Sequence, residues 1–305
     1  MKSSLHTLLL AFVLLSGCSS KPNFDDLEMD LTGLAESFDG VVGIYVKDLT
    51  TGEEIAIQAD TLFPTASMIK VPIMLTIFDR IERGELAYHQ PLIYKDSLFY
   101  SDEDITGELK DSASVLLSEM IELSITNSDN TASLWLQELA GTGVAINEWL
   151  SSQGFEGTRM NSRTPDRRPN WEVYGWGQTT PREMARLLEM VRSGEAISPA
   201  ASEEMYRVLT RIYWNDTALS QIPPTVQAAS KQGAVNASKS EVVLVNAPSG
   251  DYLFCVITKN QTDERWDYDN AGAELIREVS RRLWNAFEPN HPYTQANGYM
   301  RYVGP

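Results

Sequence analysis

Strand-like runs stand near both ends of the chain, with helical patterns between them. Near the start, residues 41–48 and 54–59 are rich in β-branched side chains and are separated by a Thr-Thr-Gly turn. Near the end, residues 226–230, 241–247 and 252–258 have the same character. One antiparallel sheet can use all of these runs only if the chain leaves the sheet and later returns to it. The predicted fold is therefore discontinuous in sequence.

The middle of the chain repeats apolar residues at helical spacing. Helices are expected there at residues 67–83, 114–123, 131–139, 144–153, 181–192 and 199–212. Two further amphipathic segments, 24–38 and 271–287, are expected to lie next to the sheet. The expected fold class is α/β (α+β): a five-stranded antiparallel sheet flanked by N- and C-terminal helices, with an all-helical insertion domain.

The domain boundaries follow from this pattern. Residues 24–61 and 213–287 are expected to form the discontinuous α/β domain, and residues 62–212 the all-helical domain. Residues 288–305, rich in Pro, Asn, Gly and Tyr, form a C-terminal tail without an assignable role. The seam between two such halves is a favoured place for a ligand site.

The first eighteen residues have the features of an export signal. Lys2 gives a positive start, residues 8–15 form a short apolar run, and Leu-Ser-Gly-Cys ends it at Cys18. This ending resembles the bacterial lipoprotein signal, which implies a lipidated Cys18, a linker over 19–26 and a periplasmic, membrane-tethered protein. An uncleaved anchor and an ordinary cleaved signal are the alternatives.

Charge and composition exclude several kinds of partner and cofactor. The chain has 42 acidic and 25 basic residues, a net charge of -17, and so repels nucleic acid. Cys255 alone remains after Cys18, and His89 and His291 alone remain after the signal. These are too few for a disulfide or a His/Cys zinc site, so we expect no metal and no cofactor. A monomer is the default expectation.

Ser67 and Lys70 are two polar residues in the otherwise apolar stretch FPTASMIKVPIM. Their spacing places both side chains on one face of a helix, where a lysine of lowered pKa could deprotonate the serine. An ordinary helix start capped by Thr65 explains the same residues. Pro72 conflicts with a smooth helix, because it removes a backbone hydrogen bond.

Two later segments have the same double interpretation. Ser128-Asp129-Asn130 stands before an apolar-periodic helix, and these residue types are also ordinary helix caps. Lys231-Gln232-Gly233 ends a strand-like run, where the lysine could present a cation and the glycine would let backbones approach. Each segment alone is weak, but their order along the chain is the order known from one group of acyl-transferring serine enzymes.

The chain resembles class A β-lactamases and their penicillin-binding relatives over about residues 24–287. The stretches ITNSDNTA and TTPREMA carry the likeness to the β-lactamase side of that group. The resemblance implies that Ser67 is the acylated nucleophile and Lys70 a base in its activation. It also implies a proton relay by Ser128 to the departing lactam nitrogen.

The same resemblance implies the substrate-binding groups. Asn130 would hold the amide side chain of the substrate, and Lys231 would attract its carboxylate. The backbone N–H groups of Ser67 and Ala234 would form the oxyanion hole. Gly233 would allow the close approach of the strand. A cation assisting Lys231 is not identified by the sequence, although Arg211 and Arg265 are candidates.

Two departures from the family pattern concern substrate binding and deacylation. Gln232 replaces a hydroxyl residue by a longer amide, which can still donate a hydrogen bond. In the loop SRTPDRRPNW, Asp166 and Asn170 keep the spacing of the family's Glu and Asn, which hold the hydrolytic water. The loop is shortened before Thr179, and Asp166 is a shorter acid, so it could equally be a solvated turn residue.

Three functions are open at this point. The favoured one is a serine β-lactamase that hydrolyses the lactam amide through an acyl-Ser67 intermediate, with slow deacylation if Asp166 is a poor base. The alternative is a D-alanyl-D-alanine carboxypeptidase or transpeptidase acting on peptidoglycan stem peptides. A non-catalytic binding lipoprotein is the third, and the intact Ser67, Lys70, Ser128, Asn130 and Lys231 argue against it.

Overall fold

The computed structural model describes residues 22–299. The expected signal over residues 1–18, with its lipidation site Cys18, lies outside the described residues. So do residues 19–21 of the linker and residues 300–305 of the tail.

Five antiparallel strands form the main sheet, in the order β2-β1-β10-β9-β8. Their bounds are β1 Val41–Asp48, β2 Glu54–Ile57, β8 Ala228–Val235, β9 Ser238–Ala247 and β10 Gly250–Lys259. The two ends of the chain meet where β1 pairs with β10, with Val41 opposite Lys259. The predicted five-stranded sheet with strands from both chain ends is confirmed.

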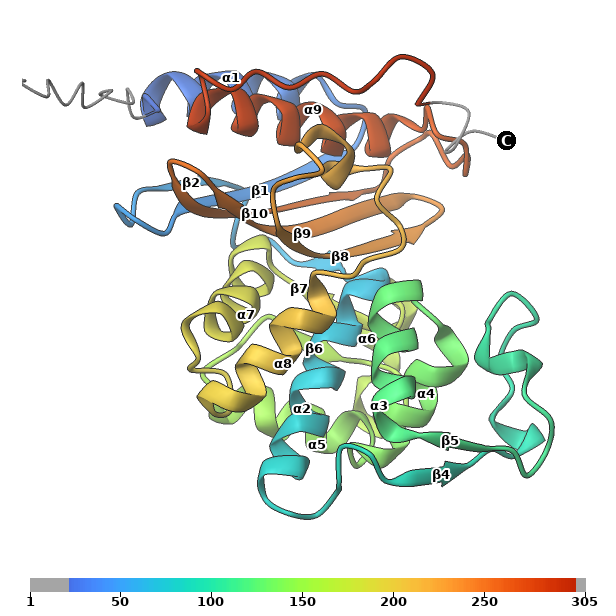
Figure 1. Ribbon diagram of the computed structural model, residues 1–305. Coiled ribbons are helices and arrows are strands. Elements are labelled where there is room, and N and C mark those ends of the chain that lie inside the picture. The colour runs from blue at the N-terminus through green and yellow to red at the C-terminus, as the bar shows by residue number, and fades with distance from the viewer. Residues whose placement is uncertain (1–21, 300–305) are drawn as a thin grey trace, which may run out of the picture.

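Helices α1 (Phe24–Ser37) and α9 (Ala271–Phe287) cover one face of this sheet (Figure 1). Both begin at an asparagine whose side chain caps the first turn, Asn23 and Asn270. Their apolar stripes pack on the alternate residues of β1 that point the same way, with Leu31 and Trp284 fully buried.

The opposite face of the sheet carries the inserted helices (Figure 1). Their bounds are α2 Lys70–Glu82, α3 Leu117–Glu122, α4 Asn130–Leu139, α5 Thr142–Ser152, α6 Arg168–Tyr174, α7 Pro181–Ser193 and α8 Pro199–Leu209. Helix α2 is the centre of this unit, because every residue from Lys70 to Phe78 is buried. Among residues 22–299 no helix is long and apolar enough to cross a membrane.

The insertion also contains short strands that the sequence pattern does not predict. They are β3 Phe63–Pro64, β4 Pro91–Ile93, β5 Ser114–Leu116, β6 Arg159–Met160 and β7 Gly177–Thr179. Two or three residues are too few for an alternating pattern to appear in the sequence. The insertion is therefore mainly helical rather than all-helical, and the domain boundaries at 61/62 and 212/213 stay predictions.

The conflict at Pro72 disappears because the helix begins later than expected. Residues Ala66–Ile69 form a separate 3₁₀ turn, and α2 starts at Lys70. Pro72 then lies in the first turn of α2, where a backbone N–H has no partner within the helix. The nucleophile candidate Ser67 is consequently on the 3₁₀ turn, and Lys70 opens the α-helix.

Candidate active site

Ser67 is half-buried on the 3₁₀ turn that leads into α2. The residue before it, Ala66, has a φ of 43°, a left-handed conformation that is strained for a residue with a Cβ. The expected cap by Thr65 does not form, since its side chain makes no capping hydrogen bond. Strain immediately before a serine at a helix start is typical of a functional turn rather than of a plain helix entry.

Lys70 is completely buried, and its ammonium group points toward the start of α4. Its Nζ donates to the backbone carbonyl of Ser128, to Ser128 Oγ at 3.1 Å and to Asn130 Oδ1 at 2.8 Å. No hydrogen bond joins Lys70 Nζ to Ser67 Oγ in the described part of the chain, although the two side chains are three residues apart. Burial lowers the pKa of Lys70 to about 7, against the opposing effect of Asp104 and Asp129.

Ser128 joins two buried lysines through one hydroxyl. Its Oγ accepts from Lys70 Nζ and from Lys231 Nζ, each at 3.1 Å. Ser128 has a left-handed φ of 61°, at the end of the π-helical turn Leu123–Asn127. This kink ends one helix and lets Asp129 cap the next one, by accepting from the N–H of Ala132 at 2.7 Å.

Lys231 is also completely buried, on the sheet strand β8 that borders the inserted helices. Besides Ser128 Oγ, its Nζ donates to the carbonyl oxygen of Gln232 at 3.0 Å and to Gln232 Oε1 at 3.1 Å. Burial lowers the pKa of Lys231 well below its usual range, and the charge of Lys70 lowers it further. The amide of Gln232 thus accepts from the lysine with its oxygen and keeps its NH₂ as a donor.

Gly233 brings β8 against the turn that carries Ser67. A Cβ at this position would lie 2.5 Å from the carbonyl oxygen of Thr65 and 3.0 Å from the backbone nitrogen of Ser67. Only a glycine therefore fits between the strand and the nucleophile turn. This contact brings the part of β8 around Gly233 and Ala234 beside the N–H of Ser67. An oxyanion hole made by the N–H groups of Ser67 and Ala234 requires this approach.

Asp104 is a positioning residue that the sequence motifs do not reveal. It is buried and accepts from the N–H of Asn130, and from the N–H and hydroxyl of Thr131, all at 2.8 Å. These bonds fix the first turn of α4, and with it the Asn130 side chain that accepts from Lys70. Its only signal in the sequence is an acid in a polar loop, SDEDIT, more than twenty residues before the segment that it holds.

The loop from residue 163 to 178 turns an arginine inward. Arg167 donates from Nε to Asn161 Oδ1 and from Nη2 to Gln178 Oε1, both at 2.7 Å. Asn170 donates to the same Gln178 oxygen at 3.0 Å. Gln178, which is 4% exposed, therefore closes this loop as a neutral acceptor.

Asp166 is exposed and makes no hydrogen bond to Ser67, Lys70 or Asn170 among the residues that the structure describes. It lies on the short turn Pro165–Arg167, beside the inward-pointing arginine. The geometry favours the interpretation of Asp166 as a solvated turn residue. Its role as a water-activating base stays a prediction.

Neither candidate for an accessory cation contacts the site. Arg211 pairs with Glu122 at 2.7 Å, and Arg265 pairs with Asp263 at 3.0 Å. Both arginines are exposed. Within residues 22–299, no group of three or more His, Cys, Asp and Glu side chains could hold a metal ion.

Comparison with known proteins gives one family for nearly the whole chain. A family model described as the β-lactamase enzyme family matches residues 26–287. The β-lactamase VEB-1 of Pseudomonas aeruginosa is 18% identical over 88% of this chain and 92% of its own length. The β-lactamase of Bacillus licheniformis is 23% identical over 95% of this chain and 96% of its own length.

Solved structures agree with this match. The structure of PBP-A superposes with a TM-score of 0.77 and 26% identity, covering 87% of this chain and 96% of that one. An ancestral class A β-lactamase superposes with a TM-score of 0.76 and 25% identity, covering 86% of this chain and 100% of that one. The predicted β-lactamase-like fold is confirmed.

The lowered pKa of Lys70 predicts how acylation of Ser67 depends on pH. A lysine acts as a base only when it is neutral, so the acylation rate should rise with pH through about 7 and level off above it. Stopped-flow acylation by a chromogenic β-lactam across this range measures the effect. Lys70→Arg, which stays protonated, should remove this rise and slow acylation about a hundredfold or more. A flat wild-type profile would contradict the assignment of Lys70 as the base.

The close approach at Gly233 predicts a loss of rate on Gly233→Ala. The added methyl group must push the strand away from Ser67, so kcat/KM should fall about a hundredfold. Gly33→Ala is the matched control, because a Cβ at Gly33 meets nothing within 4 Å. Circular dichroism melting of both variants separates a local shift from unfolding. Unchanged kcat/KM in folded Gly233→Ala would show that the strand position is not critical.

Proposed function

The chain belongs to the β-lactamase enzyme family, and we propose that it is a serine β-lactamase that opens the lactam amide through an acyl-Ser67 intermediate. One observation carries this proposal: two fully buried lysines, Lys70 and Lys231, donate to the single hydroxyl of Ser128. Burying two cations is costly unless their positions serve a purpose. A substrate that bears a carboxylate and a leaving nitrogen matches both lysines, because its carboxylate needs a cation and its leaving nitrogen needs a proton.

Acylation begins with attack on the lactam carbonyl. Ser67 Oγ forms the new bond to carbon, and its proton passes to neutral Lys70. The N–H groups of Ser67 and Ala234 stabilise the oxyanion, a contribution of about 10²–10³ in rate for each donor in comparable sites. Because Lys70 has a pKa of about 7, it can take the proton at neutral pH.

The C–N bond then breaks, and the leaving nitrogen needs a proton. Ser128 Oγ accepts from Lys70 Nζ at 3.1 Å, so the hydroxyl can give its proton to nitrogen and receive one from Lys70. Lys231 Nζ on the other side of the same oxygen supplies positive charge for the substrate carboxylate. Lys70 ends this step neutral again, and Ser67 carries the acyl group.

Deacylation requires a water molecule and a base, and the loop from residue 163 to 178 does not place a base in its interior. The groups that its interior presents are a guanidinium and two amides, from Arg167, Asn170 and Gln178. None of these is a base at neutral pH. The two acids of the loop, Asp166 and Glu172, are both exposed, so we infer that hydrolysis of the acyl-enzyme is slower than its formation.

A β-lactam ligand is supported by one relative in particular. A leucine-to-glutamate mutant of PBP-A, described as an acyl-enzyme complex with penicillin G, has a TM-score of 0.77 to this chain. This fold thus carries an acyl-enzyme with a β-lactam in that protein. The peptidoglycan alternative uses the same acylation groups, and no contact described above favours it over β-lactam hydrolysis.

Pre-steady-state kinetics with a chromogenic β-lactam test the proposal. We expect a burst of about one equivalent, because acylation is fast, followed by slower linear turnover. Mass spectrometry during turnover should find the acyl group on Ser67, and Ser67→Ala should remove both phases. A stoichiometric burst with a persistent adduct and no turnover would contradict hydrolysis and favour a peptidoglycan enzyme.

The same experiment decides the role of Asp166. Because its carboxylate is exposed and unbonded, Asp166→Asn should change the linear phase by no more than about twofold, as for other surface substitutions. The burst should also be unchanged. Selective slowing of the linear phase would instead establish Asp166 as the base for deacylation.

We also propose that the mature chain is a monomer tethered to the periplasmic side of a membrane by a lipid on Cys18. The support is the Leu-Ser-Gly-Cys ending of the apolar segment. In a bacterial host, wild type should sediment with membranes and Cys18→Ser should not, because a diacyl anchor holds the protein there. Mass spectrometry of the N-terminal peptide checks the lipid. An unlipidated wild-type peptide beginning after a different residue would contradict this proposal.

A further inference from the structure

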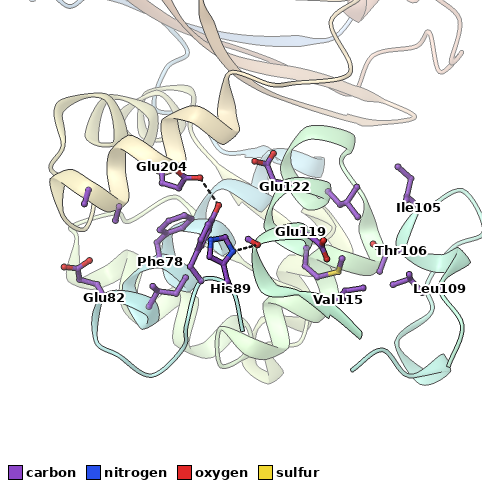
Figure 2. A pocket seen from close by; sticks show the side chains of 17 residues that line it. Phe78, Glu82, His89, Ile105, Thr106, Leu109, Val115, Glu119, Glu122 and Glu204 are labelled. Carbon is purple, nitrogen blue, oxygen red and sulfur yellow. Dashed lines mark hydrogen bonds between the residues drawn. The ribbon is translucent and has the colours of Figure 1, made fainter. Parts of the chain in front are cut away.

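A sizeable cavity of the helical insertion lies outside the catalytic cluster. It is an open groove of about 960 Å³ that crosses helix α3, within the range typical of small-molecule sites. Figure 2 shows Phe78, His89 and Glu204 on one side of α3, and Ile105, Thr106 and Leu109 on the other. None of Ser67, Lys70, Ser128 and Lys231 lines it.

One end of the groove is aromatic. The rings of Phe78 and Tyr88 have centroids 5.7 Å apart, and those of Tyr88 and His89 are 4.8 Å apart and edge-to-face. The hydroxyl of Tyr88 donates to Glu204 Oε1 at 2.9 Å, and His89 Nδ1 lies 3.1 Å from Ser118 Oγ (Figure 2). These bonds hold the ring faces in place beside a carboxylate.

The groove is lined by acidic side chains, without lysine or arginine. Four carboxylates line it, from Glu82, Glu119, Glu122 and Glu204, and none of its 17 lining residues is Lys or Arg. Arg211 binds Glu122 at 2.7 Å from outside the lining, so that carboxylate is partly neutralised. Within residues 22–299, Glu82 and Glu204 accept only from the neutral hydroxyls of Ser198 and Tyr88.

The other end of the groove is apolar, and one hydroxyl within it lacks a hydrogen-bond partner among residues 22–299. The side chains of Leu109, Val115, Met120 and Leu123 line it, together with Ile105, which is 52% exposed. The hydroxyl of Thr106 is fully buried in this wall and has no hydrogen-bond partner within the described chain. An exposed isoleucine among these apolar side chains indicates a surface that an apolar ligand would cover.

We propose that this groove binds a cationic amphiphile, a molecule with an alkylammonium head and a linear apolar chain. The head lies between the half-buried ring of Tyr88, which packs on the buried Phe78, and the carboxylates of Glu82 and Glu204. Aromatic faces with nearby carboxylates are the chemistry that recognises alkylated ammonium groups. The chain crosses α3 toward Leu109 and Ile105.

Charge complementarity selects this occupant over other apolar ligands. An anionic amphiphile would place its head among four carboxylates with no cation in the lining to offset them. A neutral one would gain the apolar contacts alone. The groove belongs to the helical insertion, so its binding can be measured whether or not Ser67 reacts with β-lactams.

Isothermal titration with three detergents of identical tail tests the proposal. Octyltrimethylammonium, octyl glucoside and octyl sulfate are compared below their micelle concentrations, with full-length protein. The cationic probe should bind at least about fivefold more tightly than the glucoside, the gain typical of a cation on aromatic faces. Equal affinity of all three would overturn the proposal, as would tighter binding of the sulfate.

Matched variants locate the site. Glu204→Gln keeps an acceptor for Tyr88 but removes charge, and should weaken the cationic probe severalfold while leaving the glucoside unchanged. Glu203→Gln, an exposed neighbour outside the lining, should change neither. At the apolar end, Ile105→Asp should weaken both probes. Val144→Asp, at an exposed position of α5 outside the lining, should weaken neither. Equal loss in both members of either pair would place binding elsewhere on the surface.

Discussion

The burial of two lysines around one serine hydroxyl is the constraint that the rest of this structure serves. Lys70 and Lys231 are both inaccessible to water, and each donates to Ser128 Oγ. Burial lowers the pKa of both lysines, and the charge of Lys70 lowers the pKa of Lys231 further. The site can hold a base at neutral pH because it keeps Lys70 away from water.

This arrangement explains two strained backbone turns and one buried acid near the site. The left-handed backbone at Ser128 carries the relay hydroxyl that both lysines contact, and the left-handed Ala66 precedes the nucleophile Ser67. Asp104 binds the start of α4 through hydrogen bonds and keeps Asn130 in reach of Lys70. The strain at the two turns is therefore held by the packing of buried neighbours.

Long, strongly periodic elements were predictable, and short ones were not. Helix α9 begins and ends at Ala271 and Phe287 as its amphipathic pattern indicates, and β1 likewise keeps its expected bounds. Helix α3 begins at Leu117 rather than Ser114, because residues 114–116 pair with β4. Helix α6 was missed, since seven residues containing Pro169 give no clear period. In the site, the order of motifs indicated Ser67, Ser128 and Lys231, whereas Asp104 and Arg167 act through contacts that have no local pattern.

The pairing of β1 with β10 has a consequence for when the protein becomes reactive. Strand β10 pairs with β1 from the other end of the chain, and β8, which carries Lys231, reaches the sheet only through β9 and β10. A chain made from its N-terminus therefore holds Ser67 and Lys70 long before their partner exists. Closing so long a loop is slow and late in folding. Until β8, β9 and β10 have joined β1, the nascent protein is therefore an inactive precursor of the enzyme.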